Sequence, residues 1–396
     1  MIKFGIDSFL SDAQAYKKNA GVGLISNSSA VTGGGVINLA AIVEAGLKVK
    51  CVFSPEHGYF ANIRDGEYIK DGKHPELDIP IFSLFTEGHD RNAIADNADA
   101  HGLDLLIFDI QDVGVRFYTY IHALGIALSA SAACQLPLIV LDRPNPVSCA
   151  LVEGSVPDPE YISELCPYMI PERYAMTIGE LAKFLAGRVY KKAILSVVPV
   201  SNYRPEMYYR ETSLTWRNPS PAMVSPETAL FYPGTCFFEG TNLSEGRGTA
   251  APFQTLGSPF ADGKAIAAGM RDILALDEFS RISVTPCEFT PASSKFEKIK
   301  SSGVSLSASG SNFRSMLFGI LLLKTFHDRF KNDFKFIVSP KSGVHFFDRL
   351  AGGPALRSVV ENGTRDDIFA LFDSWKKENE EFARACSKTN IYKRLS

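Results

Sequence analysis

Acidic and basic side chains follow the predicted strands at the points where these strands end. Glu56 and His57 come directly after the apolar run 49–54, within the turn Ser-Pro-Glu-His-Gly. The later strand-like runs lead into five further charged groups: Asp109, Asp112, Arg116, Asp142 and Arg143. The carboxyl ends of parallel strands meet at one edge of a sheet, and ligands of open α/β sheets bind there. We therefore expect an active-site cleft at this edge.

Several carboxylates in one cleft, without a nucleophile motif, favour general acid and base catalysis. Burial and like-charged neighbours can raise the pKa of one carboxyl, so that it donates a proton while another stays ionised. Glycoside hydrolysis usually needs such a pair. Glu56 is the candidate for proton exchange, with His57 orienting it and Asp109 or Asp112 assisting. The arginines suit an anionic substrate group, because the guanidinium fork matches a carboxylate.

Each of these residues also has a structural interpretation. Asp109 could brace the loop that follows it. Asp142 and Arg143 could form an internal ion pair that holds the turn Asp-Arg-Pro-Asn-Pro, although Arg143 also stays a candidate for substrate binding. His57 could be only an orienting partner of a carboxylate.

A second group of polar residues lies in the segment 232–249, which is rich in glycine and hydroxyl side chains. Its candidate substrate-binding residues are Glu239, Asn242, Glu245 and Arg247. We expect them to form a binding loop. The alternative is a glycine-rich turn whose charges are solvated.

The elements that must position these residues alternate between strand and helix. Short apolar runs predict strands at 21–27, 49–54, 79–84, 103–110, 136–142 and 194–200. Helical spacing falls between them at 36–46, 119–135 and 177–188, the last with a capping box of Thr177 and Glu180. Short buried strands that alternate with helices predict a parallel sheet covered on both faces. The fold class is therefore α/β, with a Rossmann-like, doubly wound parallel sheet.

The rest of the chain predicts a second, smaller α/β domain. Residues 203–260 are rich in Pro, Gly and aromatic residues, which indicates ordered loops folded onto the site. Beyond them we expect helices at 261–275, 312–330 and 365–386 and a strand at 282–289. The predicted domains are residues 1–260 and 261–396.

Composition excludes several classes of protein. The 396 residues include 41 Lys and Arg and 44 Asp and Glu, a net charge of −3. This balance argues against binding nucleic acid through bulk positive charge. No run reaches the ~20 apolar residues of a membrane span, so we expect no membrane partner. The oligomeric state is not predicted.

Cofactor motifs are missing from the sequence. No GxGxxG follows the first strand, and there is no P-loop, GxSxG elbow or HExxH. The seven Cys lack metal-finger spacing and are expected to be reduced thiols. We expect no cofactor and no metal. The chain as given starts without a signal peptide, which predicts a cytoplasmic location, or a periplasmic or secreted one if a leader has been trimmed.

Long motifs resemble those of a bacterial family of exo-β-N-acetylmuramidases, formerly a family of unknown function. They are FSPEHG (53–58), FDIQDVGVRFYTY (108–120), LDRPNP (141–146), MTIGELA (176–182), NPSPAM (218–223), YPGT (232–235) and EGTNLSEGRGT (239–249), with a weaker match in HFFDRLAGG (345–353).

The resemblance implies two domains that meet at a cleft and the release of N-acetylmuramic acid from the non-reducing end of peptidoglycan fragments. It implies a catalytic role for Glu56, and neither metal nor nucleotide. The lactyl carboxylate of muramic acid would explain the arginines, with Arg116 and Arg247 as candidates. Asn27 and Tyr118, which lie in the matching region, are predicted to contact the substrate.

The chain departs from the family pattern at three places. The loop after LDRPNP usually continues with two glycines and here reads Val147-Ser148-Cys149. An Asn is usual where Ala222 stands, and a Gly where Ala175 stands. The lost Asn could alter a substrate contact, so a modified muramic acid or another amino sugar is an alternative substrate. A non-catalytic binder of cell-wall amino sugars and a nucleotide-dependent enzyme are the alternative functions.

Overall fold

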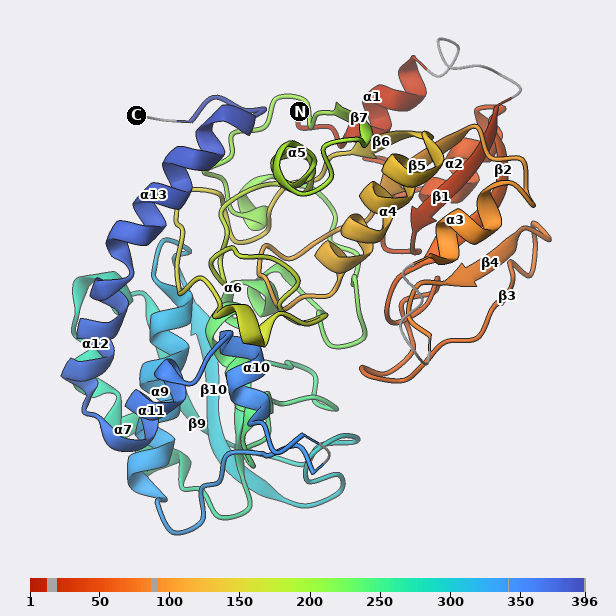
Figure 1. The fold of residues 1–396 in the computed structure, drawn as a ribbon. Helices are drawn as coiled ribbons and strands as arrows, with labels where there is room; N and C mark the ends of the chain where they lie inside the picture. The colour runs from red at the N-terminus through yellow and green to blue at the C-terminus, as the bar shows by residue number, and fades with distance from the viewer. Residues whose placement is uncertain (13–19, 87–91, 341, 395–396) are drawn as a thin grey trace.

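A seven-stranded, mostly parallel sheet forms the centre of the larger domain (Figure 1). The computed structural model describes residues 1–12, 20–86, 92–340 and 342–394. In sheet order the strands are β3 (Gly72–Lys73), β4 (Pro80–Ser83), β2 (Lys48–Ser54), β1 (Gly21–Ser26), β5 (Leu105–Asp109), β6 (Pro137–Leu141) and β7 (Ile194–Val198). All pairs are parallel except β3 with β4. The predicted α/β class and doubly wound sheet are confirmed.

Helices cover both faces of this sheet. Their bounds are α1 (Gly5–Ser11), α2 (Asn38–Glu44), α3 (Ala93–Ala98), α4 (Tyr120–Cys134) and α5 (Ile178–Arg188). Successive strand residues point to opposite faces, so Leu24 packs in the core under α1 and α2, whereas Ile25 packs in the core under α3, α4 and α5. Burial on both faces explains the continuous apolar runs of the strands. The predicted capping box of Thr177 and Glu180 is present at the start of α5.

The smaller domain contains an antiparallel sheet in the order β8 (Thr255–Ser258), β10 (Ser301–Ala308), β9 (Ile282–Phe289). Its helices are α6 (Pro226–Thr235), α7 (Gly263–Gly269), α8 (Arg271–Leu274), α9 (Ser315–Arg329), α10 (Phe346–Ala351), α11 (Ala355–Asn362), α12 (Arg365–Ser374) and α13 (Lys376–Cys386). Short 3₁₀ helices occur in both domains: η2 (Pro159–Tyr161) and η3 (Tyr209–Glu211) precede α6, and η4 (Cys236–Gly240), η5 (Asp277–Phe279) and η6 (Ser387–Thr389) follow it.

Several predicted elements of this domain differ from the observed ones. The helices expected at 261–275 and 365–386 are each divided into two, the second at Trp375. α6 and β8 lie within the segment expected to consist of loops. α6 packs so closely on α9 that a side chain at Gly234 would collide with the backbone of Gly319. Glycine allows this close approach. The division at residues 260 and 261 stays a prediction, although β8 pairs with β10 and α6 packs on α9, so these elements are grouped with the smaller domain.

The C-terminal segment returns to the larger domain (Figure 1). The Tyr392 hydroxyl donates to Asp142 Oδ2 at 2.6 Å, and Arg394 Nη2 pairs with Glu180 Oε2 at 2.7 Å. Both acceptors are buried in the larger domain. The end of the chain therefore fastens the two domains together.

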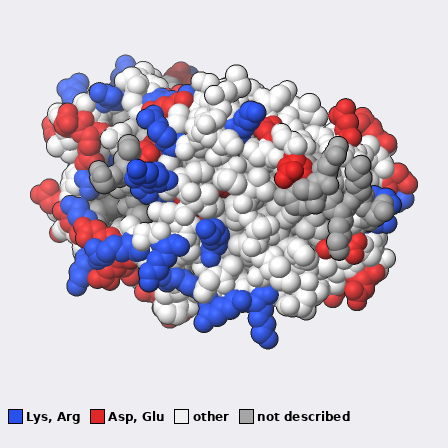
Figure 2. Space-filling view, turned by 90° about the horizontal axis from the view of Figure 1, so that it is seen from above, with Lys and Arg blue, Asp and Glu red and all other residues white. Residues whose placement is uncertain are grey.

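Charges of both signs share the surface shown in Figure 2. In this view Lys and Arg mix with Asp and Glu on the left, Asp and Glu predominate on the right, and a broad central part carries few charged side chains. Within the described ranges no helix has the length and apolar character needed to span a bilayer.

Candidate active site

Glu56 lies on the wall of a cavity of about 320 Å³ that both domains line. The larger domain contributes the turn after β2 and the segment 117–119, and the smaller domain contributes η4 and α10. Of the predicted site residues, the cavity brings together Glu56, His57, Tyr118, Glu239 and Arg247. This is the carboxyl edge of the central sheet, where the sequence predicts the site.

Two hydrogen bonds hold the Glu56 carboxylate. Thr119 Oγ1 donates to Oε2 at 2.7 Å, and the backbone N–H of Gly66 donates to Oε1 at 2.9 Å. The turn is tight because His57 and Gly58 both have positive φ, 71° and 74°. These contacts fix the carboxylate at the cavity, and none of the described residues gives it a cationic partner.

His57 stabilises the loop that carries Glu56. Its Nδ1 lies 2.8 Å from the carbonyl oxygen of Ile63. The imidazole therefore closes the loop between residues 57 and 63, and its described contact is with the backbone rather than with the Glu56 carboxylate. Any effect on Glu56 acts through the shape of this loop.

Tyr118 lies on the cavity wall, but its hydroxyl oxygen is buried. Burial raises the pKa of Tyr118 above its ordinary value; the negative charges of Asp112 and Glu56 add to this, while hydrogen bonds with Ser220 and Tyr120 oppose it. The hydroxyl therefore stays protonated at neutral pH and belongs to the packing behind the wall.

Arg247 is surrounded by carboxylates. Its guanidinium lies 2.8 Å from Glu239, 3.2 Å from Asp65 and 3.6 Å from Glu245. Lys295 also contacts Glu245, at 3.1 Å. The cluster thus holds three carboxylates against two cations. Burial, with the nearby charges of Glu245 and Asp65, raises the pKa of Glu239, although Arg247 opposes this.

Asp109 and Arg143 form a buried ion pair away from the cavity wall. Arg143 Nε lies 2.6 Å from Asp109 Oδ1, and Asn38 Nδ2 donates to Asp109 Oδ2 at 2.8 Å. Arg143 Nη2 also donates to the carbonyl oxygen of Val31 at 3.0 Å. Asp109 is fully buried. In these contacts the pair braces the loops around β1 and β5.

Asp112 lies in the core rather than on the cavity wall. Its Oδ2 accepts hydrogen bonds from the Gly114 N–H, at 2.7 Å, and from the Tyr174 hydroxyl. Burial raises the pKa of Asp112 to about 6, against the lowering effect of these donors. It therefore fixes the loop that leads to Tyr118.

Arg116 is fully buried and binds the end of α10. Its Nη2 donates to the carbonyl oxygens of Leu350 and Ala351 at 3.3 and 2.9 Å, and pairs with Glu172 at 3.2 Å. Its Nη1 donates to two more carbonyl oxygens, those of Ser155 and Ile170. The guanidinium thus joins the two domains behind the cavity.

Asn27 and Asn242 connect loops instead of lining the cavity. Asn27 Nδ2 donates to the Tyr120 hydroxyl at 2.8 Å and to the Pro219 carbonyl oxygen at 3.4 Å. The residues after Pro219 line the cavity, so Asn27 positions them. Asn242 hydrogen-bonds to the backbone of Asp333 and Lys335, both at 2.8 Å. Glu245 is buried behind Arg247 and is likewise outside the wall.

Sequence reasoning missed several residues on the cavity wall: Asp65, Thr119, Glu164 and Arg349. Thr119 and Arg349 lie within the motifs that carry the family resemblance, so these motifs could have pointed to them. Asp65 and Glu164 lie in loops whose sequence shows no pattern that would select them.

The departures from the family pattern have a structural meaning. Ser148 and Ala175 both adopt positive φ, 68° and 53°, a conformation that glycine adopts without strain. Ala222 lines both the cavity and an adjoining hollow of about 350 Å³, which also share Asp65 and Arg247. The position where an Asn is usual therefore lies on the wall of both hollows, although Ala222 itself is largely buried.

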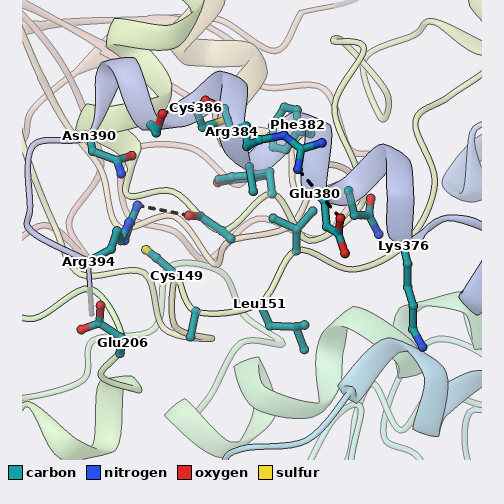
Figure 3. A pocket seen from close by; sticks show the side chains of 17 residues that line it. Cys149, Leu151, Glu206, Lys376, Glu380, Phe382, Arg384, Cys386, Asn390 and Arg394 are labelled. Carbon is teal, nitrogen blue, oxygen red and sulfur yellow. Dashed lines mark hydrogen bonds and ion pairs between the residues drawn. The ribbon is translucent and has the colours of Figure 1, made fainter. Parts of the chain in front are cut away.

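A larger cavity of about 610 Å³ lies between α13 and the segment 149–152 (Figure 3). Its wall is largely apolar, with Leu151 and Phe382, while Arg394 and Cys149 lie close together on one side. None of the carboxylates described above lines it. In the part of the chain that the structure describes, no three His, Cys, Asp or Glu residues are grouped to hold a metal ion.

This chain is thus a two-domain α/β protein with several carboxylates, Glu56 and Glu239 among them, on one interdomain cavity. Residues 22–227 match the family model for the N-terminal part of the exo-beta-N-acetylmuramidase NamZ, and residues 230–392 match the model for its C-terminal part. The chain belongs to this family. It is 32% identical to the peptidoglycan beta-N-acetylmuramidase NamZ of Bacillus subtilis (strain 168), over 99% of this chain and 91% of that protein.

Two solved structures share the fold, both DUF1343 family proteins from Bacteroides fragilis. One has a TM-score of 0.84 and covers 99% of each chain. The other has a TM-score of 0.74 and covers 100% of each chain. Both are 26% identical to this protein.

Proposed function

We propose that this protein is a glycosidase that releases terminal N-acetylmuramic acid from the non-reducing end of peptidoglycan fragments. The observation that carries the proposal is Glu56 on the wall of a sugar-sized interdomain cavity, oriented by Thr119 and Gly66. The family membership and the identity to a curated peptidoglycan muramidase support it.

Glu56 exchanges the proton in this mechanism. Its carboxyl group donates a proton to the bridging oxygen as the bond between that oxygen and the anomeric carbon breaks. A water molecule then supplies its oxygen to the anomeric carbon, and its proton returns to Glu56. The two hydrogen bonds to Glu56 keep the carboxyl group in place through both steps.

Glu239 is the second carboxyl group of the mechanism. It lines the same cavity, and Arg247 Nη2 fixes its Oε1 at 2.8 Å. Its negative charge stabilises the positive charge that develops at the anomeric carbon, or at the acetamido group if that group attacks first.

The test is incubation with the disaccharide N-acetylmuramic acid–N-acetylglucosamine, with the products followed by proton NMR. We expect free N-acetylmuramic acid, and its first-formed anomer distinguishes retention from inversion. If the protein released N-acetylmuramic acid neither from this disaccharide nor from any other muramoyl glycoside, the proposal would be wrong.

The alternative, a non-catalytic binder, is separated by the variant Glu56→Gln. An enzyme loses turnover in this variant but still binds the disaccharide. A binder shows no turnover in either form.

A further inference from the structure

The described residues of the cavity wall include more carboxylates than cations. Among the described residues that line it, the charged side chains are Glu56, Asp65, Glu164, Glu239, Arg247 and Arg349. A muramoyl group differs from a glucosaminyl group by its lactyl ether, which ends in a carboxylate. An anionic substrate therefore needs a cation on this wall that is not already neutralised.

Arg247 does not meet this need. Three carboxylates already surround it, all within 3.6 Å, and its guanidinium stacks over the ring of Phe253 at 5.0 Å. A further carboxylate there would meet the excess negative charge of the cluster. Arg116 and Arg143 are buried in the pairs described above. The two candidates from the sequence, Arg116 and Arg247, are thus both occupied.

Arg349 is in a different situation. Its side chain is 37% exposed, and within the described ranges its guanidinium makes one polar contact, with Glu164 Oε2 at 4.0 Å. This distance is too long for a hydrogen bond. The donors of Arg349 are therefore available to a ligand in the cavity.

The backbone that carries Arg349 is held firmly. Arg116 binds the last carbonyl groups of α10, and Arg357 makes a two-pronged pair with Asp348 at 2.8 and 3.1 Å. α10 also packs directly on η4, since a side chain at Gly240 would collide with Phe347. η4 carries Glu239. The backbone of Arg349 is thus held against the element that carries Glu239, and both side chains line the same cavity.

We propose that Arg349 binds the lactyl carboxylate of the terminal muramoyl group and so selects muramoyl over glucosaminyl glycosides. The inference rests on the proposed function and names the specificity residue of that site. Glu164 is the partner that Arg349 leaves when the substrate carboxylate arrives.

The experiment compares two disaccharides, one with the free lactyl carboxylate and one with its neutral methyl ester. In Arg349→Gln, kcat/KM for the free acid falls ~10- to 100-fold, the size expected for a lost charge-assisted hydrogen bond. The change comes mainly from a higher KM, and kcat/KM for the ester changes ~2-fold or less. The control is Arg384→Gln, an exposed arginine on α13 outside this cavity, and it leaves both substrates unchanged.

A second variant tests the role of Glu164. Glu164→Gln removes the competing carboxylate, so KM for the free acid decreases ~2- to 5-fold, consistent with a weak and partly exposed ion pair. If Arg349→Gln lowered kcat/KM equally for both disaccharides, or left kcat/KM unchanged for both, the proposal would be wrong. An increase of KM in Glu164→Gln equal to that in Arg349→Gln would also contradict it, because it would indicate a structural brace.

Binding measured by calorimetry gives a readout that does not depend on turnover. The wild-type protein binds free N-acetylmuramic acid more tightly than N-acetylglucosamine, and Arg349→Gln loses this preference. If the wild type cleaved neither disaccharide, but Arg349→Gln still lost the binding preference, the proposed function would fail while the binding role of Arg349 would stand. If it cleaved the free acid and Arg349→Gln kept the preference, only the inference would fail.

Discussion

Two groups of charged residues lie past the carboxyl ends of the central strands, and only one of them faces a cavity. The first, Asp109 with Arg143, starts on the last residue of β5 and is sealed in the core. The second, with Glu56, lies two residues beyond the end of β2 and lines the interdomain cavity. Distance from the strand does not explain the difference, because Arg143 also lies two residues beyond its strand, β6, and is buried. What differs is that the turn after β2 faces the smaller domain across a cavity.

The comparison teaches that strand-end charges divide into braces and reactive groups by their surroundings. The Asp109 carboxylate has a cation and an amide as partners, which compensates its burial. The Glu56 carboxylate has two neutral donors and an open side. Substitutions in the two groups should therefore affect different measurements.

The largest effect is expected at Glu56. Glu56→Gln keeps the size of the side chain but removes its acid and base function, so kcat falls ~10²- to 10⁴-fold. The midpoint of thermal unfolding stays close to that of the wild type. Turnover of the disaccharide and a thermal melt are the measurements, and a kcat within a few-fold of the wild type would remove Glu56 from the mechanism.

The next effect concerns the sealed pair. Asp109→Asn leaves a buried, uncompensated guanidinium, so the free energy of unfolding falls by ~3–5 kcal/mol. Urea unfolding measures this loss, and kcat per folded molecule stays near its original value. Replacing both partners, Asp109→Leu with Arg143→Met, restores part of the stability. A large fall in kcat at unchanged stability would instead place Asp109 in the catalytic machinery.

A pH effect is expected at Asp112, which belongs to neither of the two groups. Its pKa rises from 3.8 to about 6 on folding, so the folded state binds the proton more tightly. Its contribution to stability is fully present below pH ~4, is lost as the pH rises to ~6, and amounts to ~3 kcal/mol. Asp142 has the same direction of shift.

Asp112→Asn removes this contribution from the pH dependence. Urea unfolding between pH 4 and pH 8 should show a smaller decrease of stability in the variant than in the wild type, with turnover largely kept. An unchanged pH dependence would show that Asp112 does not gain the proton on folding. Loss of turnover would return it to the list of catalytic candidates.

The smallest effect is expected at Ala222. Ala222→Asn places an amide on the wall shared by the cavity and the adjoining hollow, and one added hydrogen bond lowers KM for the disaccharide ~2- to 10-fold. Steady-state kinetics measure it, with Ala222→Leu as a control for bulk. An unchanged or higher KM in Ala222→Asn would mean that the position does not contact this substrate.

Much of the fold could be predicted because its signals are local. The continuous apolar runs and the capping box at Thr177 mark the strands and α5 without any knowledge of distant contacts. β10 was missed because its sequence, SSGVSLSA, is rich in serine and weak in the residues that favour strands. α6 was missed because Pro233 and Gly234 lie inside it.

The site was only partly predictable because its partners come from distant segments. Glu56 could be placed from its turn, directly after a strand. Nothing near Arg116 in the sequence shows that it binds the carbonyl groups of residues 350 and 351. Nor does the sequence near Arg247 show that Asp65 will neutralise it.

The buried guanidinium of Arg116 also limits how the molecule can move. Swinging the domains apart would remove the two acceptors that α10 supplies, while Glu172 and the carbonyl groups of Ser155 and Ile170 would remain. Each lost hydrogen bond to a charged group costs ~1.5–3 kcal/mol. We therefore expect sugars to enter and leave through rearrangement of loops rather than by a hinge motion of the domains. Because both domains line the cavity, fragments produced by cutting the chain between α5 and α6 should lack it.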